Sequence, residues 1–171
     1  MLSTDQKGSI AETAIIHAAV KLGIDVYKPV SDGTRYDLIF DTGGRLIRVQ
    51  CKWARRYGDV VVVRTYSNRR ARQGMIRRVY TAREIDAFAV YCAELDRVYF
   101  LPIESFERQS QIYLRLTPTR NIQTLGIHAA EAYEFGATLR AQGAVAQLGE
   151  RRHGMAEAAG SSPAGSTTAF R

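Results

Sequence analysis

Two apolar-rich segments, residues 35–40 and 45–53, are separated only by the turn sequence Asp41-Thr42-Gly43-Gly44. Adjacent glycines supply the positive φ angles that a short hairpin loop requires. The two segments are therefore predicted to be neighbouring antiparallel strands. Because one face of such a hairpin has to be buried, this feature constrains the fold of the chain more than any other.

Further apolar segments extend this hairpin into a sheet. Runs rich in β-branched and aromatic residues predict strands over 24–30, 60–66, 86–92, 97–101 and 113–116. Residues 93–96 form a link short enough to join two of these strands as a hairpin. The sheet is predicted to be mixed.

Helices are predicted over residues 9–22, 102–106 and 127–139. In the first of them, Ile15, Ala19 and Leu22 recur at helical spacing. Gly23 follows where a residue with a left-handed conformation would end the helix. The helix before the sheet is thus the best-defined helix in the sequence.

Residues 68–83 are basic, contain a glycine and show no clear period, which indicates a mobile loop with a short helix. A chain of 171 residues, 46% of them hydrophobic, fits a single domain. The predicted fold class is α/β, a central mixed β-sheet flanked by helices. The domain is expected to span residues 1–142.

Residues 143–171 are rich in Ala, Gly, Ser and Thr with few large apolar side chains, so we expect a disordered tail. Residues 145–151 back-translate to a sequence that resembles the D-arm of a transfer RNA gene, and residues 160–163 to one that resembles the T-arm. The two matches have the order and approximate spacing of these arms. We interpret the tail as read-through of a tRNA gene, the alternative being a functional disordered tail.

Positive charge is concentrated in one part of the chain. Residues 45–78 contain eleven Lys and Arg but one acidic residue, Asp59, whereas the rest of the chain has 13 basic and 16 acidic residues. Such a segment is expected to face a phosphate backbone. A solvated basic face is the alternative.

Cys51 and Cys92 lie within apolar runs and form no metal-binding or redox motif, so both are predicted to be buried thiols in a reducing compartment. No apolar stretch approaches the roughly 20 residues that cross a bilayer. Residues 1–6 are polar rather than leader-like. The sequence predicts a cytoplasmic protein with no membrane partner.

The central hairpin carries a group of polar residues. Asp37 lies on its first strand, and Gln50 and Lys52 share one face of the second because side chains alternate along a strand. A carboxylate, an amide and an ammonium are thus expected to converge. This set suits metal-dependent phosphodiester hydrolysis, in which Asp37 holds a divalent cation and Lys52 orients or activates water. A cross-strand salt bridge between Asp37 and Lys52 would give the same spacing.

Three sequence segments together resemble the core of the PD-(D/E)XK nuclease superfamily. They are Lys7-Gly8-Ser9-Ile10-Ala11-Glu12, Tyr36-Asp37-Leu38-Ile39 and Gln50-Cys51-Lys52. The chain is most similar to the homing endonucleases encoded by group I introns, in which Gln replaces an acidic residue of the motif. The resemblance covers residues 7–133 and implies a restriction-endonuclease-like fold and a DNA endonuclease activity.

The resemblance also implies a site and a cofactor. Glu12, Asp37, Gln50 and Lys52 would be the catalytic residues. Mg²⁺, for which Mn²⁺ can substitute, would be held by Asp37, the Cys51 backbone carbonyl and Glu12 through water. Gln50 contributes no charge, so the cation would depend on these groups and on the substrate phosphate. A degenerate site that only binds DNA would carry the same amide.

Glu12 has a second interpretation. Ser9 and Glu12 have the spacing of a capping box, in which Glu12 would serve only the start of the helix. The family resemblance favours the metal site. The three histidines, His17, His128 and His153, have no spacing that suggests a ligand set.

The DNA-contacting residues are expected in the basic segment, where Arg side chains, Asn68 and Gln73 could read base edges. They are predicted to be Arg55, Arg56, Arg64, Asn68, Arg69, Arg70, Arg72, Gln73, Arg77 and Arg78. The partners would be double-stranded DNA and further copies of the chain, because one small active site cannot cut both strands. We expect a homodimer or homotetramer.

Two other functions remain open from the sequence. A Holliday-junction resolvase would use the same chemistry on a four-way junction. A DNA-binding protein with an inactive site would be consistent with Gln50.

Overall fold

The computed structural model describes residues 1–31, 33–72, 74–118 and 127–141, with the backbone alone at residues 69–71. The elements in chain order are α1 (Thr4–Lys21), β1 (Asp25–Tyr27), β2 (Leu38–Asp41), β3 (Leu46–Tyr57), β4 (Val60–Arg64), β5 (Tyr66–Ala71), β6 (Gly74–Val79), β7 (Ala87–Cys92), β8 (Arg97–Pro102), α2 (Ile103–Phe106), β9 (Gln111–Arg115), β10 (His128–Ala129), the 3₁₀ helix η1 (Ala130–Tyr133) and α3 (Phe135–Ala141).

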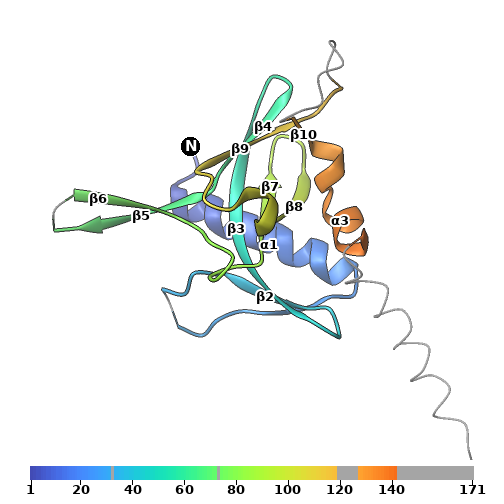
Figure 1. Ribbon diagram of the computed structural model, residues 1–171, viewed down its shortest axis with the longest axis horizontal. Coiled ribbons are helices and arrows are strands. Elements are labelled where there is room, and N and C mark those ends of the chain that lie inside the picture. The colour runs from blue at the N-terminus through green and yellow to red at the C-terminus, as the bar shows by residue number, and fades with distance from the viewer. Residues whose placement is uncertain (32, 73, 119–126, 142–171) are drawn as a thin grey trace, which may run out of the picture.

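Eight strands form one mixed sheet, and β5 and β6 form a separate two-stranded ribbon. The long strand β3 is the centre of the larger sheet (Figure 1). It pairs in parallel with β7 and antiparallel with β2 and β4, while β7 continues into the β7–β8 hairpin. The predicted α/β class and the predicted hairpin between residues 35–40 and 45–53 are confirmed.

The sheet splits on one edge of β3. Val49 pairs with both β2 and β7, and Ala54 pairs with both β4 and β7, so β2 and β4 share the edge opposite β7. β2 pairs only as far as Val49, and β4 pairs only from Ala54 onward. The backbone of residues 50–53 therefore faces a gap on this edge.

Buried side chains form two clusters, which side-chain alternation assigns to the two faces of the sheet. One contains Val49 and Cys51 of β3 and packs against α1 through Ile15 and Ala19. The other contains Ala54 of β3 together with buried rings on the opposite face, including Tyr80, Phe88, Tyr99 and Phe106. Both cysteines are free and buried, as predicted.

Helix α1 begins five residues before the predicted start at residue 9. Its capping box is formed by Ser3 and Gln6, whose side chains exchange hydrogen bonds with each other's backbone amides at 2.9 and 3.1 Å. Ser9 lies inside the helix, where its hydroxyl donates to the Asp5 carbonyl. The capping interpretation of Glu12 is therefore wrong, and its carboxylate is available for other contacts.

The prediction of a mobile loop over residues 68–83 is also wrong. Strands β5 and β6 pair antiparallel from Tyr66↔Val79 to Ala71↔Gly74, and they extend to one side of the larger sheet (Figure 1). Every residue of β6 up to Arg78 is exposed. A strand with no buried residue shows no hydrophobic alternation, so the sequence of β6 lacks the expected period of a strand.

The C-terminal part of the domain is less helical than predicted. Residues 127–139 contain the short strand β10, the 3₁₀ helix η1 and the start of α3 in place of one helix. The predicted tail, residues 143–171, lies outside the described residues. In the described part of the chain, no helix is long and apolar enough to cross a membrane.

Candidate active site

Asp37 lies directly before β2 and faces the gap on the edge of β3. Its Oδ2 atom accepts a 2.8 Å hydrogen bond from the backbone N–H of Cys51 and another hydrogen bond from Gln50 Nε2. The Asp37 N–H donates to the Val49 carbonyl at 2.9 Å, which fixes the carboxylate relative to β3. The predicted convergence of Asp37 and Gln50 is thus present in the structure.

The amide nitrogen of Gln50 lies between two oxygen atoms, because it also contacts the Cys51 carbonyl at 3.3 Å. Both oxygens belong to groups that the family resemblance assigns to a metal site. Gln50 itself is 8% exposed, so its amide is held within the protein.

Lys52 projects toward the opposite side of the gap, where it meets the ribbon. Its Nζ donates to the Tyr80 hydroxyl at 3.4 Å and to the Tyr66 carbonyl at 3.5 Å, and it lies 4.9 Å from the centre of the Tyr80 ring. The described residues include no ion pair between Lys52 and Asp37. The alternative interpretation, a cross-strand salt bridge between Asp37 and Lys52, is therefore wrong.

Glu12 reaches the site from α1. Its Oε2 accepts a 2.7 Å hydrogen bond from Lys28 Nζ, just beyond the end of β1. The Glu12 side chain is 25% exposed, whereas that of Lys28 is 65% exposed. Lys28 was not anticipated from the sequence, because the contact depends on how α1 packs beside β1.

Burial and neighbouring charges set the ionisation of the site. Burial raises the pKa of the Asp37 carboxyl above its ordinary value, the Cys51 N–H lowers it in part, and the charge of Glu12 adds to the increase. Burial also lowers the pKa of the Lys52 ammonium to about 8, with Asp37 opposing this change and Arg35 adding to it. The Asp37 carboxyl therefore responds to the charges of both Glu12 and Lys52.

The donor set fits a hard divalent cation. Asp37 and the Cys51 carbonyl present oxygen atoms to one point, and oxygen is the ligand that Mg²⁺ prefers. A cation at this point would require the Gln50 amide to move out of the space between the two oxygens and to turn its own oxygen toward the cation. Among the described residues, no group of three or more His, Cys, Asp or Glu side chains could hold a metal. The backbone carbonyl and the amide would therefore have to supplement the carboxylates.

The basic residues predicted to contact DNA lie on two parts of the fold. Arg55, Arg56 and Arg64 are exposed on β3 and β4. The ribbon and its turn carry the exposed residues Asn68, Arg72, Arg77 and Arg78. Arg69 and Arg70 belong to β5, and Gln73 lies outside the described residues.

The sequence analysis did not predict a network of side chains at the base of the ribbon. The Arg35 guanidinium stacks on the Tyr80 ring at 3.9 Å, and its Nε donates to Glu84 at 3.1 Å. Glu84 also pairs with Arg78 of β6. The spacing of these residues in the chain gives no signal, because they meet only when the ribbon folds back on the sheet.

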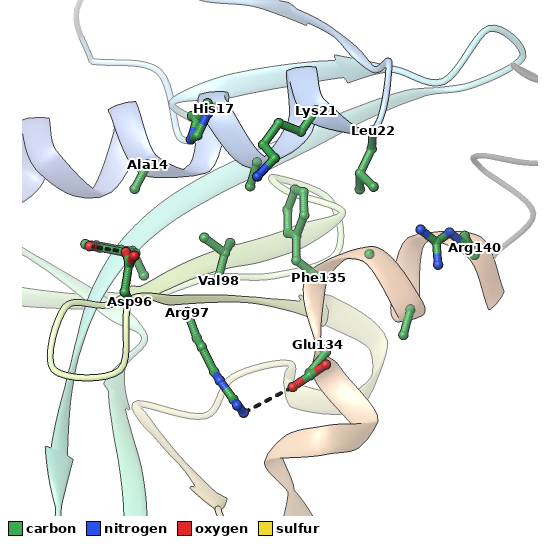
Figure 2. Close-up of a pocket in the computed structure, with 14 residues that line it drawn as sticks. Ala14, His17, Lys21, Leu22, Asp96, Arg97, Val98, Glu134, Phe135 and Arg140 are labelled. Carbon is green, nitrogen blue, oxygen red and sulfur yellow. Dashed lines mark hydrogen bonds and ion pairs between the residues drawn. The ribbon is translucent and has the colours of Figure 1, made fainter.

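A surface pocket lies away from this site. It has a volume of about 680 Å³ and is lined by residues of α1, β8 and α3, including His17, Lys21 and Arg140 (Figure 2). An Arg97–Glu134 ion pair of 3.2 Å closes one side of it. None of the predicted site residues lines this pocket in the described part of the chain.

The family model of the PD-(D/E)XK endonucleases matches residues 2–136. The chain belongs to this endonuclease family. Among solved structures, the bacterial homing endonuclease I-Ssp6803I is 32% identical to this endonuclease, with a TM-score of 0.69 over 86% of this chain and 99% of the other. No curated protein matches the chain.

Family membership and this likeness identify the protein as an endodeoxyribonuclease with a restriction-endonuclease-like fold. The endonucleases of this family generally use divalent metal ions. The substrate of this protein is DNA. The nuclease and fold predictions made from the sequence are confirmed.

Proposed function

We propose that this endonuclease is a Mg²⁺-dependent, site-specific enzyme of the homing type that cuts double-stranded DNA. The observation that carries the proposal is the convergence of the Asp37 carboxylate and the Cys51 carbonyl on one point. Lys52 is the next residue of β3, and the charge of Asp37 acts on its ammonium. The likeness to the homing endonuclease I-Ssp6803I supports the site-specific class, because it extends over nearly the whole length of that protein.

Asp37, the Cys51 carbonyl and, through water, Glu12 would hold Mg²⁺, and Mn²⁺ could replace it. When bound, the ion supplies a Lewis acid that stabilises negative charge on the scissile phosphate. Lys52 orients the attacking water and offsets the charge that develops on the phosphate. Gln50 would supply an oxygen ligand without adding charge to the site.

The ribbon would lie against the DNA. A two-stranded ribbon fits the major groove, and the exposed Asn68 and Arg77, which are directly opposed in the β5–β6 register, have the side-chain types that bond to base edges. Arg69, Arg70, Arg72, Arg78 and the arginines of β3 and β4 would contact phosphates. Gln73 would read base edges, as the sequence predicts. Each active site would then cut one strand.

Cutting both strands requires two active sites, so we infer that the endonuclease acts as a homodimer or homotetramer. Sedimentation of the full chain with and without DNA tests this inference. A monomer on cleaved DNA would contradict it.

The proposed function is tested by incubating the full chain with a plasmid library of random inserts and with a duplex spanning an uninterrupted tRNA gene. Mg²⁺, Mn²⁺ or no metal is added, and the cleaved ends are sequenced. We expect metal-dependent cuts in both strands at one defined sequence. Preference for a synthetic four-way junction without a sequence requirement would favour the resolvase alternative. Binding without cleavage in any metal would contradict the proposed activity.

A further inference from the structure

The Tyr80 ring contacts two positively charged side chains that come from different segments of the fold. Lys52 reaches it from β3, and Arg35 stacks on it at 3.9 Å from the segment that leads into β2. Tyr80 is 4% exposed, and its ring also packs edge-on against Phe88 at 5.4 Å. The ring is therefore fixed by the core, and the two cations are placed relative to it.

Arg35 ties this ring to both strands of the ribbon. It donates hydrogen bonds of 2.8 Å to the Ser67 hydroxyl of β5 and 2.9 Å to the Val79 carbonyl of β6. Its Nε and one of its terminal nitrogens donate to the two carboxylate oxygens of Glu84, at 3.1 and 3.4 Å. A planar guanidinium with five donors can make these bonds together, whereas an ammonium cannot.

Lys52 is held by the same base of the ribbon. Its two hydrogen-bond partners are the Tyr80 hydroxyl and the Tyr66 carbonyl, and Tyr66 is the first residue of β5. Ordering a long lysine side chain costs conformational entropy. Both hydrogen bonds are long, so a small shift of the ribbon or of the ring changes where the ammonium lies.

Arg35 also belongs to the segment that carries Asp37. Only Tyr36 separates the residue that binds the ribbon from the carboxylate of the site. The ribbon is thus connected to the site in two ways, through Arg35 to Asp37 along the chain and through Tyr80 to Lys52 in space.

We propose that Arg35 and Tyr80 are positioning residues for DNA cleavage, which hold the Lys52 ammonium at the site and couple its position to the seating of the β5–β6 ribbon on DNA. The inference rests on the proposed role of Lys52. It adds a physical link between the surface that binds DNA and the group that acts on the phosphate. DNA that moves the ribbon moves Lys52 with it.

The position of Lys52 can be observed without catalysis. The chain has only four lysines, Lys7, Lys21, Lys28 and Lys52, so ¹³Cε-lysine labelling gives four NMR signals, and Lys52→Ala assigns one of them. The Tyr80 ring shifts the Lys52 signal away from those of exposed lysines. We expect Arg35→Lys, which keeps the charge, to move this signal toward the exposed position. This variant has a fifth lysine signal, so Lys52→Ala in the same background assigns the signal of Lys52. Binding of a DNA duplex should move it in the wild type and move it less in Arg35→Lys.

Activity gives the second measurement, using the duplex that the wild type cuts in the screen above. Tyr80→Phe removes one hydroxyl and keeps the ring, so we expect the single-turnover rate at saturating protein to fall about tenfold, as for the removal of one hydrogen bond to a charged group. Arg35→Lys should lower this rate by about ten- to a hundredfold. DNA affinity measured without metal should change less than the rate in both variants.

Matched controls lie at the pocket of Figure 2. Arg97→Lys makes the same chemical change at an ion pair with Glu134, and Tyr91→Phe removes a hydroxyl that donates to Asp96 at 2.9 Å. Neither should move the Lys52 signal or the rate. Melting temperatures confirm that each variant is folded.

An unchanged Lys52 signal in Arg35→Lys would overturn the proposal. So would a rate that falls only as far as DNA affinity falls. The proposed function fails separately, if Lys52→Ala cleaves DNA at the wild-type rate.

Discussion

The backbone N–H of Cys51 donates a 2.8 Å hydrogen bond to Asp37 Oδ2 across the gap in the sheet. The candidate metal-binding carboxylate is thus anchored by main chain and not only by a side chain. Because a strand residue directs its N–H and C=O to the same side, the Cys51 carbonyl faces the gap as well. Side chains in the site can therefore be replaced one at a time without displacing Asp37.

We expect Asp37→Asn and Lys52→Ala each to reduce cleavage by at least about a hundredfold, because they remove charge stabilisation at the phosphate. DNA binding and melting temperature should change little. Asp96→Asn and Lys21→Ala, at the pocket of Figure 2, are matched controls that should cleave normally. Wild-type cleavage by both site variants would contradict the assigned site.

Gln50→Glu should make stability depend more strongly on metal. Without metal, the new carboxylate faces Asp37 where an amide nitrogen now donates a hydrogen bond, so the melting temperature should fall. Added Mg²⁺ should restore it by a larger increment than in the wild type, because a ligand that binds the folded state stabilises it. Equal increments in both proteins would count against a cation site at this point. Cleavage by this variant also reports whether Lys52 keeps its position.

Replacing Arg69, Arg70 and Arg72 of the ribbon with Gln should weaken DNA binding and flatten its salt dependence. The slope of log affinity against log salt is expected to fall by about one unit for each phosphate that the protein no longer neutralises. The matched control is Arg97→Gln with Arg140→Gln, which removes charge at the pocket. An unchanged slope would indicate that the ribbon arginines face solvent in the complex.

Asp86 should stabilise the protein at neutral pH and lose this effect in acid. Burial alone would raise the pKa of its carboxyl, but hydrogen bonds from the Arg48 side chain and backbone N–H lower it below the ordinary 3.8. A carboxyl with a lowered pKa contributes stability above its unfolded pKa and loses it as pH falls through the folded value. We expect urea denaturation to show Asp86→Asn as less stable than the wild type at neutral pH, with the difference shrinking below the ordinary pKa. A difference that grows in acid would contradict this sign.

Truncation after Gln142 should leave melting temperature and cleavage rate unchanged. The removed segment contains few large apolar side chains, so it offers little area to bury against the domain. The full chain and the truncated chain are compared in the same buffer. A clear loss of stability, or of assembly, would show that residues 143–171 contribute to the domain.

Local sequence patterns were enough to predict the centre of the fold and the core of the site. The turn at residues 41–44 and the apolar segments beside it predicted one hairpin. Alternation of side chains along β3 then placed Gln50 and Lys52 on the opposite face from Val49 and Cys51. These features depend on neighbours a few residues apart, and the period of a strand is enough to place them.

The partner of each of these side chains depends on how distant segments pack. The spacing of Asp37 and Lys52 allowed an ion pair, but the split between β2 and β4 directs Asp37 to Gln50 and leaves Lys52 to Tyr80. Lys28 reaches Glu12 only because α1 lies beside β1. The ribbon escaped prediction because β6 is exposed up to Arg78, so burial imposed no pattern on the sequence of this strand. Its pairing with β5 is visible only in the folded chain.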